Sequence, residues 1–244
     1  MKKSKKIKSV IFVMSLAVIL VVCTLVYVNI GGEEAPIPIE GGTAHNLRRK
    51  KTLQTHKEIA VDDPLLMLVN NENEIPPDYE AVPRLYGDVI VDVKIYDDLV
   101  RLIEDAAKDG MTLWIASGYR TVDVQEKLYD VAVDDNVKLG MSNREAKTVA
   151  SQTIALPGYS EHHTGLAVDF NTVSEDFENT PEYAWLQENA ENYGFVKRYE
   201  AEKTEITGIE EEVWHYRYVG VKHAKQMNEL DMCLEEYCKY LQNP

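Results

Sequence analysis

Residues 160–169 constrain this chain more than any other stretch. They place a histidine and an aspartate, His162 and Asp169, on either side of Gly165. On a regular strand, positions seven residues apart point to opposite faces, so these two side chains can share a metal ion only if the backbone turns between them. Glycine adopts turn conformations at the lowest steric cost. The stretch therefore predicts a turn at Gly165 and then a short strand, on which small side chains lead up to Asp169.

A catalytic zinc site usually has three protein ligands and an open position for water, so a third ligand is needed elsewhere in the chain. His215 is the candidate, because Glu212 lies three residues before it. The histidine would bind the ion, and the carboxylate would reach the water as general base. Six histidines are an ordinary number for a chain of this size. Spacing alone therefore leaves open that His162 is a surface residue or a hydrogen-bonded core residue.

The N-terminal segment has the pattern of a membrane anchor. Its first nine residues carry five lysines and no acid, and residues 10–28 form a continuous apolar run. A helix of that length crosses a bilayer at about 1.5 Å per residue. No A-x-A-like cleavage pattern follows, and the bulky Val22 before Cys23 argues against lipoprotein processing. An uncleaved anchor is therefore favoured over a cleaved or lipidated form.

The distribution of charge orients this anchor, because basic residues on the short N-terminal side place that side in the cytoplasm. We expect a cytoplasmic tail over residues 1–9, a transmembrane helix over 10–28, an extracellular linker over 29–62 and one zinc peptidase domain over 63–244. The protein would cross the cell membrane once, with its catalytic domain outside. Taking the five tail lysines from the 26 basic residues leaves 21 against 41 acids, a formal charge of −20 outside. This acidity argues against nucleic acid as a partner.

Two cysteines lie close together near the C-terminus. Cys233 and Cys238 would stand in an oxidising compartment, where a local disulfide can form. Spacing does not fix the Cβ geometry that a disulfide requires. A disulfide and two free thiols therefore both remain open.

Apolar periodicity and turn residues predict helices and short strands with little βαβ alternation. Helices are expected over residues 93–107, 122–139, 142–153, 181–193, 222–230 and 234–241, and strands over 113–117, 166–170, 195–199 and from 213 onward. Ser142 and Glu145 have the form of a capping box. The order indicates an α+β fold, with helices packed on a small antiparallel sheet. The two metal-binding segments would be neighbouring strands of that sheet.

Several motifs in a fixed order now give a resemblance to a known family. They are Ser117-Gly118-Tyr119-Arg120, then Gln125, then Ser160-x-His162-x-x-Gly165-x-Ala167-x-Asp169, and finally Glu212-x-x-His215. In this order the chain resembles the VanY-type D,D-carboxypeptidases and their D-Ala-D-Ala dipeptidase and L,D-carboxypeptidase relatives. The similarity covers about residues 64–241.

The resemblance implies a role for each motif residue. His162, Asp169 and His215 match the family's zinc ligands, and Glu212 matches its catalytic base. The resemblance further implies the following roles outside the ligand set: oxyanion stabilisation by Arg120, binding of the substrate's terminal carboxylate by Ser160, and substrate-side positions for Tyr119 and Gln125. His163 is expected not to be a ligand, because at a strand-like position it would point away from its neighbour.

The function implied is that of a zinc-dependent D,D-carboxypeptidase. Zinc chemistry and an exported, anchored domain both point to peptidoglycan stem peptides, whose ends carry D-alanine. An L,D-carboxypeptidase acting on tetrapeptide stems is an alternative, and no single residue decides between the two. A non-catalytic wall-binding domain that retains the metal is another alternative. The presence of Glu212 favours an enzyme.

Overall fold

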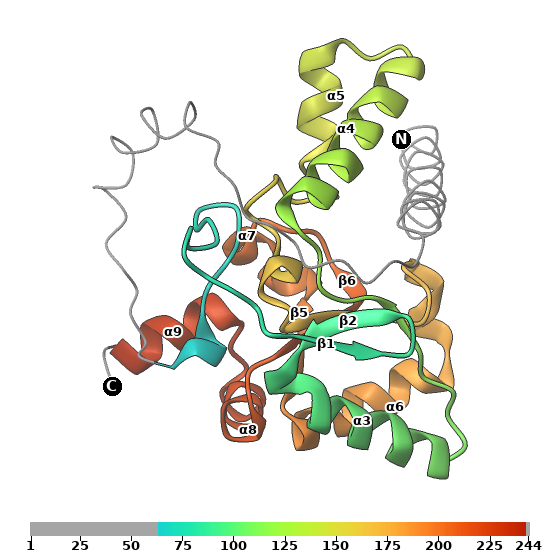
Figure 1. Cartoon of the computed structure of the whole chain (residues 1–244), viewed down its shortest axis with the longest axis vertical. Helices are drawn as coiled ribbons and strands as arrows, with labels where there is room; N and C mark the ends of the chain where they lie inside the picture. The colour runs from blue at the N-terminus through green and yellow to red at the C-terminus, as the bar shows by residue number, and fades with distance from the viewer. Residues whose placement is uncertain (1–62, 243–244) are drawn as a thin grey trace, which may run out of the picture.

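The computed structural model describes residues 63–242, which form an α+β fold (Figure 1). A four-stranded sheet has the order β3-β4-β6-β5, and each neighbouring pair is antiparallel. A separate antiparallel hairpin, β1-β2, was not expected from the sequence. The strands are β1 (Pro83–Tyr86), β2 (Val89–Asp92), β3 (Ile115–Ser117), β4 (Ala167–Phe170), β5 (Phe195–Tyr199) and β6 (Glu212–Tyr218). The predicted fold class is therefore confirmed.

Helices flank this sheet near the predicted positions. The α-helices are α3 (Val93–Lys108), α4 (Val122–Lys138), α5 (Asn143–Ala150), α6 (Pro181–Asn189), α7 (Thr204–Thr207), α8 (Val221–Leu230) and α9 (Leu234–Gln242). The 3₁₀ turns are η1 (Pro64–Leu66), η2 (Glu161–Thr164), η3 (Glu175–Asn179), η4 (Ala190–Tyr193) and η5 (Ala201–Lys203). The capping box of Ser142 and Glu145 is present at α5. The expected helix over 181–193 divides into α6 and η4, which ends at Gly194 with φ +84°.

The two faces of the four-stranded sheet have different chemistry. One face carries apolar side chains of β4, β5 and β6 that pack against α3 and α6 in the main core. Because side chains alternate along a strand, the residues between them lie on the other face. That face carries Asp169 on β4, His215 and Arg217 on β6, and Arg198 on β5, all of them buried. The sheet therefore holds a cluster of charged side chains on the face opposite its apolar core.

A second apolar cluster lies under the C-terminal helices. Residues of α8 and α9 pack there with Leu66 of η1 and Val196 of β5. Cys233 and Cys238 are buried in this region, and both are free thiols. Of the two states left open by the sequence, the structure has the reduced one.

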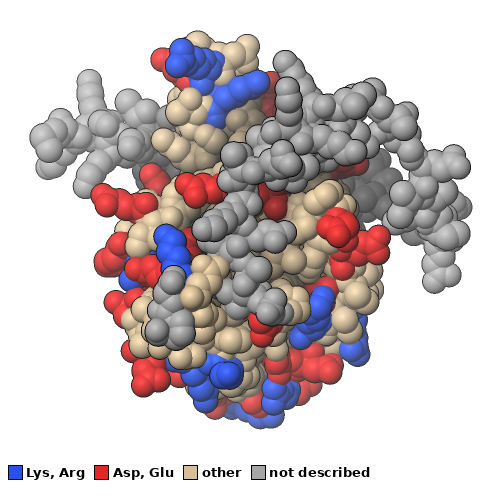
Figure 2. Space-filling view, turned by 90° about the vertical axis from the view of Figure 1, so that its left-hand side faces the viewer, with Lys and Arg blue, Asp and Glu red and all other residues tan. Residues whose placement is uncertain are grey.

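Helices α4 and α5 form a hairpin that stands away from the rest of the domain (Figure 1). A small apolar cluster holds them together, and it includes Val133 of α4, Ala146 of α5 and Ile154 just beyond α5. On the face shown in Figure 2, acidic and basic side chains are interspersed over the described part of the surface. Among residues 63–242, no helix is both long and apolar enough to cross a membrane. The expected tail, anchor and linker over residues 1–62 lie outside the described residues.

Candidate metal centre

Strands β4 and β6 bring two predicted ligands side by side. Asp169 and His215 are direct partners in the antiparallel register. His162 approaches from η2, and the three side chains offer ligand atoms that all lie within 4.8 Å of one another. All three residues are buried. The structure thus brings together the three residues that the sequence indicated as ligands.

The turn at Gly165 makes this convergence possible. Gly165 has φ +68°, a left-handed conformation that side chains other than glycine rarely adopt. Its carbonyl oxygen accepts a hydrogen bond of 2.9 Å from the backbone N–H of Asp92. A Cβ at this position would lie 2.9 Å from that same nitrogen. Glycine is therefore required both for the backbone angle and for the close approach of Asp92.

The hydrogen bonds of His162 leave one ring nitrogen facing the cluster. Its Nδ1 lies 2.7 Å from the carbonyl oxygen of Gly118, which can only accept, so Nδ1 carries the proton. Burial and the nearby Arg120 lower the pKa of His162 to about 4, against the opposing effect of Asp169. The ring is therefore neutral at pH 7, and Nε2 presents a lone pair to Asp169 Oδ2 at 3.3 Å. Two acceptors in this position fit a cation between them.

His215 completes the set from the opposite side. Its Nδ1 lies 2.9 Å from Asp169 Oδ1, and its Nε2 lies 3.4 Å from Glu161 Oε2. Burial alone would lower the pKa of His215, but the two carboxylates raise it to about 9. A bound cation would displace this proton, because a ligating histidine is neutral. Two imidazole nitrogens and one carboxylate oxygen form a common zinc ligand set, so the residues present fit zinc.

Glu212 stands at the start of β6 beside the cluster. Its Oε2 lies 3.7 Å from His215 Nδ1. Burial raises the pKa of Glu212 to about 7. The nearby carboxylates of Asp169 and Glu161 also raise this pKa, whereas His215 lowers it. A carboxylate with a pKa near the working pH is well suited to take and return a proton. The position and the pKa both suit a general base.

Arg120 follows β3 and reaches the same cluster. Its Nη1 donates a 2.8 Å hydrogen bond to Gln125 Oε1, and its Nη2 lies 3.7 Å from Asp169 Oδ2. Its buried Nε has no hydrogen-bond partner within the described part of the chain. Gln125 also donates to the carbonyl of Ala155, so both ends of its amide are used inside the protein. Gln125 therefore orients Arg120 in this structure. Tyr119, the residue before the arginine, is partly buried.

Ser160 and His163 make contacts that organise η2. Ser160 Oγ accepts a 3.4 Å hydrogen bond from the backbone N–H of His162 and caps the turn. His163 Nε2 accepts from the N–H of Gly158 at 3.1 Å, and its Nδ1 donates to the carbonyl of Arg120 at 2.8 Å. With both ring nitrogens engaged, His163 has none left for a metal. The expectation that it is not a ligand agrees with this geometry, although the reason is its hydrogen bonds in a 3₁₀ turn and not strand alternation.

A group of buried charges behind His215 was not recognised in the sequence. Glu161, Arg198, Arg217 and Glu235 are each at most 5% exposed and form ion pairs with one another. Two signals could have indicated them. Glu161 lies inside the metal motif, and Arg217 follows His215 at a spacing of two, which places both on the same face of β6.

Comparison with known proteins covers most of this domain. The family model described as VanY: D-alanyl-D-alanine carboxypeptidase matches residues 89–221. A D-alanyl-D-alanine carboxypeptidase of Enterococcus faecalis is 39% identical over 198 residues, which are 80% of this chain and 74% of that protein. The matched family region contains the three candidate ligands together with Arg120 and Glu212.

Solved structures are similar over the same domain. VanYB in complex with D-alanine-D-alanine is 40% identical with a TM-score of 0.65, and the match covers 71% of this chain and 97% of that one. A vancomycin resistance D,D-pentapeptidase VanY variant in complex with Zn(II) has the same identity and TM-score, over 70% of this chain and 97% of that one. The LdcB LD-carboxypeptidase is 35% identical with a TM-score of 0.62, over 72% and 86%. The chain therefore belongs to the VanY family of D-alanyl-D-alanine carboxypeptidases.

Proposed function

We propose that this protein is a zinc-dependent D,D-carboxypeptidase that removes the C-terminal D-Ala from peptidoglycan stem pentapeptides. The observation that carries the proposal is the convergence of His162, Asp169 and His215 beside Glu212. The similarity to VanYB in complex with D-alanine-D-alanine and to a VanY variant in complex with Zn(II) supports the same substrate end and the same metal.

The side chains of the cluster divide the chemistry between them. Zinc held by the two histidines and the aspartate would polarise the scissile carbonyl and make water a better nucleophile. Glu212 takes the water proton and passes it to the leaving amine. Arg120 is always charged and directs N–H donors to the cluster, so it stabilises negative charge that develops on the carbonyl oxygen. Gln125 holds that guanidinium in place.

An L,D-carboxypeptidase that acts on tetrapeptide stems is the second candidate. The similarity to the LdcB LD-carboxypeptidase favours it, since its TM-score is close to that of VanYB. Both reactions need the same ligands and the same base, and they differ in the shape of the substrate pocket. We favour the D,D reaction because the identity to the D,D enzymes is higher.

The proposed reaction takes place on the outer face of the cell membrane. The support is the N-terminal sequence, in which five lysines precede a long apolar run. A domain held outside by this anchor would meet the peptide stems of the wall directly.

Three stem peptides distinguish these functions. The purified full-length chain would be assayed with a pentapeptide ending in D-Ala-D-Ala, a tetrapeptide ending in an L-centre followed by D-Ala, and a pentapeptide ending in D-Ala-D-lactate as a control for amide specificity. We expect release of D-Ala from the first peptide, loss of activity with a chelator and recovery with zinc. Faster cleavage of the tetrapeptide would make the protein an L,D-carboxypeptidase. Turnover of none of them by the zinc-loaded chain would indicate a binding domain.

A further inference from the structure

We propose that Glu161 is a positioning residue of the metal centre, which accepts the Nε2–H of His215 and so leaves the Nδ1 lone pair of that ring for the cation. This inference rests on the zinc site proposed above. It goes further because it assigns a role to a buried carboxylate that neither binds the ion nor touches substrate.

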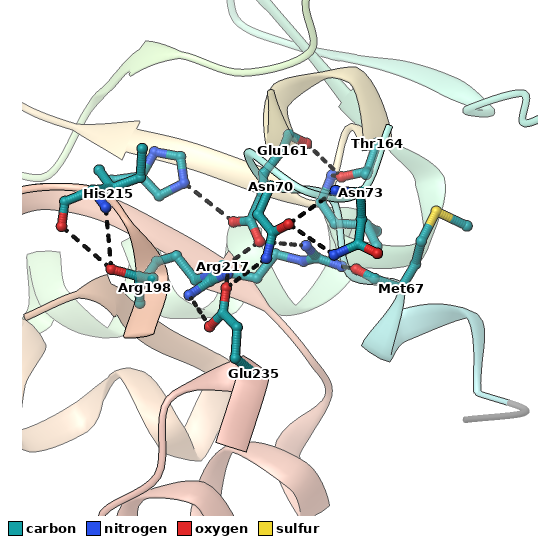
Figure 3. Close-up of polar contacts among 12 residues, drawn as sticks. Met67, Asn70, Asn73, Glu161, Thr164, Arg198, His215, Arg217 and Glu235 are labelled. Carbon is teal, nitrogen blue, oxygen red and sulfur yellow. Dashed lines mark hydrogen bonds and ion pairs between the residues drawn. The ribbon is translucent and has the colours of Figure 1, made fainter. Parts of the chain in front are cut away.

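The orientation of the His215 ring is the first observation. One ring nitrogen faces Asp169, and the other faces Glu161 Oε2 at 3.4 Å. The ring of Tyr199 packs over His215 with centroids 5.1 Å apart, and His162 meets it edge-on at 5.0 Å. The imidazole therefore packs against two other rings, and Glu161 is the acceptor for its second ring nitrogen (Figure 3).

The two oxygens of Glu161 have separate partners. Oε1 accepts a hydrogen bond of 2.8 Å from Arg198 Nε and one of 2.9 Å from Arg217 Nη1. Oε2 is directed to His215. Because both arginines are always charged, the carboxylate they hold offers Oε2 only as an acceptor. A carboxylate that accepts from a ligating histidine fixes its tautomer and makes it a better ligand.

The arginines are themselves held from several directions. Arg217 Nη2 donates to the carbonyls of Leu65 and Met67 at 3.1 and 2.8 Å. Arg198 makes two hydrogen bonds of 2.9 and 2.6 Å to Glu235 on α9. The cluster pairs two positive charges with two negative ones, all of them buried. Glu161 therefore sits in a rigid frame that fixes where its second oxygen points.

A purely structural role is the competing explanation, and Glu235 provides the matched control. Glu235 is a buried carboxylate that pairs with the same Arg198, but its other partner is the amide of Asn70 and not a histidine. Replacing either glutamate by glutamine removes one buried negative charge from the same cluster. Only the change at position 161 alters the partner of His215.

Glutamine at position 161 should reverse the tautomer of His215. A glutamine has one acceptor oxygen, and the two arginines would take it through charged hydrogen bonds. Its NH₂ group would then face His215 Nε2 and donate to it, which would move the ring proton to Nδ1. That is the nitrogen from which the metal would need a lone pair. Loss of such a supporting partner typically weakens metal binding by about 10- to 100-fold.

Zinc affinity and the ring tautomer test this directly. For the full-length chain and the variants Glu161→Gln and Glu235→Gln, the zinc Kd would be measured by competition with a chelator. Nitrogen NMR of the metal-free chain, at a pH above the His215 pKa of about 9 so that the ring is neutral, would identify the His215 tautomer. We expect Glu161→Gln to weaken zinc binding by about 10- to 100-fold with the proton on Nδ1. Glu235→Gln should keep the wild-type Kd and tautomer even where it lowers the melting temperature.

A charge-neutral pair of variants keeps the test decisive if Glu161→Gln does not fold. Glu161→Met with Arg217→Met removes one charge of each sign, and Arg198→Met with Glu235→Met is its control. The first should lose zinc affinity by about 10- to 100-fold, and the second should lose less, because Arg217 still holds Glu161. Equal zinc affinity in the two, or a wild-type Kd in Glu161→Gln, overturns the positioning role. If the wild-type chain itself binds no zinc, the proposed function is refuted. That result involves no variant, so it is distinct from a failure of the positioning role alone.

Discussion

At the scale of single residues, Glu212 can be separated from the metal ligands by one substitution. Glu212→Gln keeps the shape of the side chain but cannot accept a proton, so kcat should fall by on the order of 10² to 10⁴. That loss corresponds to roughly 3 to 5 kcal/mol of barrier. Zinc content should stay near wild type. Glu211→Gln is the neighbouring control, because Glu211 pairs with Lys197 instead. Near-normal kcat in Glu212→Gln would refute its role as base, and loss of zinc would make Glu212 a ligand.

The proton on His215 predicts how zinc binding depends on pH. The pKa of His215 is raised to about 9, so below that pH a proton has to leave before the ring can bind a cation. Zinc affinity should therefore increase with pH, by about tenfold per unit between pH 6 and 9. Chelator competition at several pH values would measure the slope. An affinity that is constant across this range would contradict the assignment of His215 as a ligand.

The adjacent histidines should respond differently to truncation. His162→Ala removes a ligand and should abolish stoichiometric zinc binding. His163→Ala should retain the metal but lose hydrogen bonds to Gly158 and Arg120, which costs about 1 to 3 kcal/mol of unfolding free energy because it leaves buried backbone groups unpaired. Zinc content and chemical denaturation would be measured for both. The opposite result for zinc would shift the ligand assignment by one residue.

At the scale of elements, the turn at Gly165 connects η2, which carries His162, to β4, which carries Asp169. Gly165→Ala combines a left-handed backbone angle with overlap against Asp92, so we expect it to cost roughly 2 to 5 kcal/mol and to weaken zinc binding. Gly87→Ala is its control, because Gly87 also has a positive φ but a Cβ there meets nothing within 4 Å. That change should cost about 1 kcal/mol and leave zinc affinity unchanged. Chemical denaturation and zinc titration would be measured for both variants. Equal losses of stability and of zinc affinity in the two would contradict the role given to Gly165.

The predictability of each element followed from its burial pattern. Strand β4 was expected because every second residue is apolar and packs in the core. The β1-β2 hairpin was missed because three of the four residues of β1 are exposed and its sequence carries no such alternation. The 3₁₀ turn η2 was also missed, since its side chains are buried all around and show no period. The three candidate ligands could still be found, because their spacing around Gly165 and Glu212 reflects chemistry and not periodicity.

At the scale of the whole molecule, the buried ion pairs could not be predicted from the sequence. Glu161, Arg198 and Glu235 come from a turn, a strand and a helix that are far apart along the chain. Each looks like an ordinary surface charge until its partner is known. Long-range pairing of this kind depends on the tertiary fold, which local patterns do not specify.

The N-terminal sequence makes a prediction about the location of the whole protein. Five lysines before the apolar run should keep the first residues inside and the domain outside. Protease added to wall-stripped cells should therefore digest the domain. A cytoplasmic protein would serve as the control for cell integrity. Protection of the domain in intact cells would show that the orientation is the reverse.

The contact of α9 with Arg198 ties the C-terminal helix to the buried charges beside the metal centre. Glu235 lies near the end of the described chain, yet it makes two hydrogen bonds to Arg198, which in turn pairs with Glu161. A chain trimmed before residue 234 would therefore keep two buried arginines against one buried carboxylate, and an uncompensated buried charge is strongly destabilising. Proteolytic removal of α9 should thus lower the melting temperature of the whole domain.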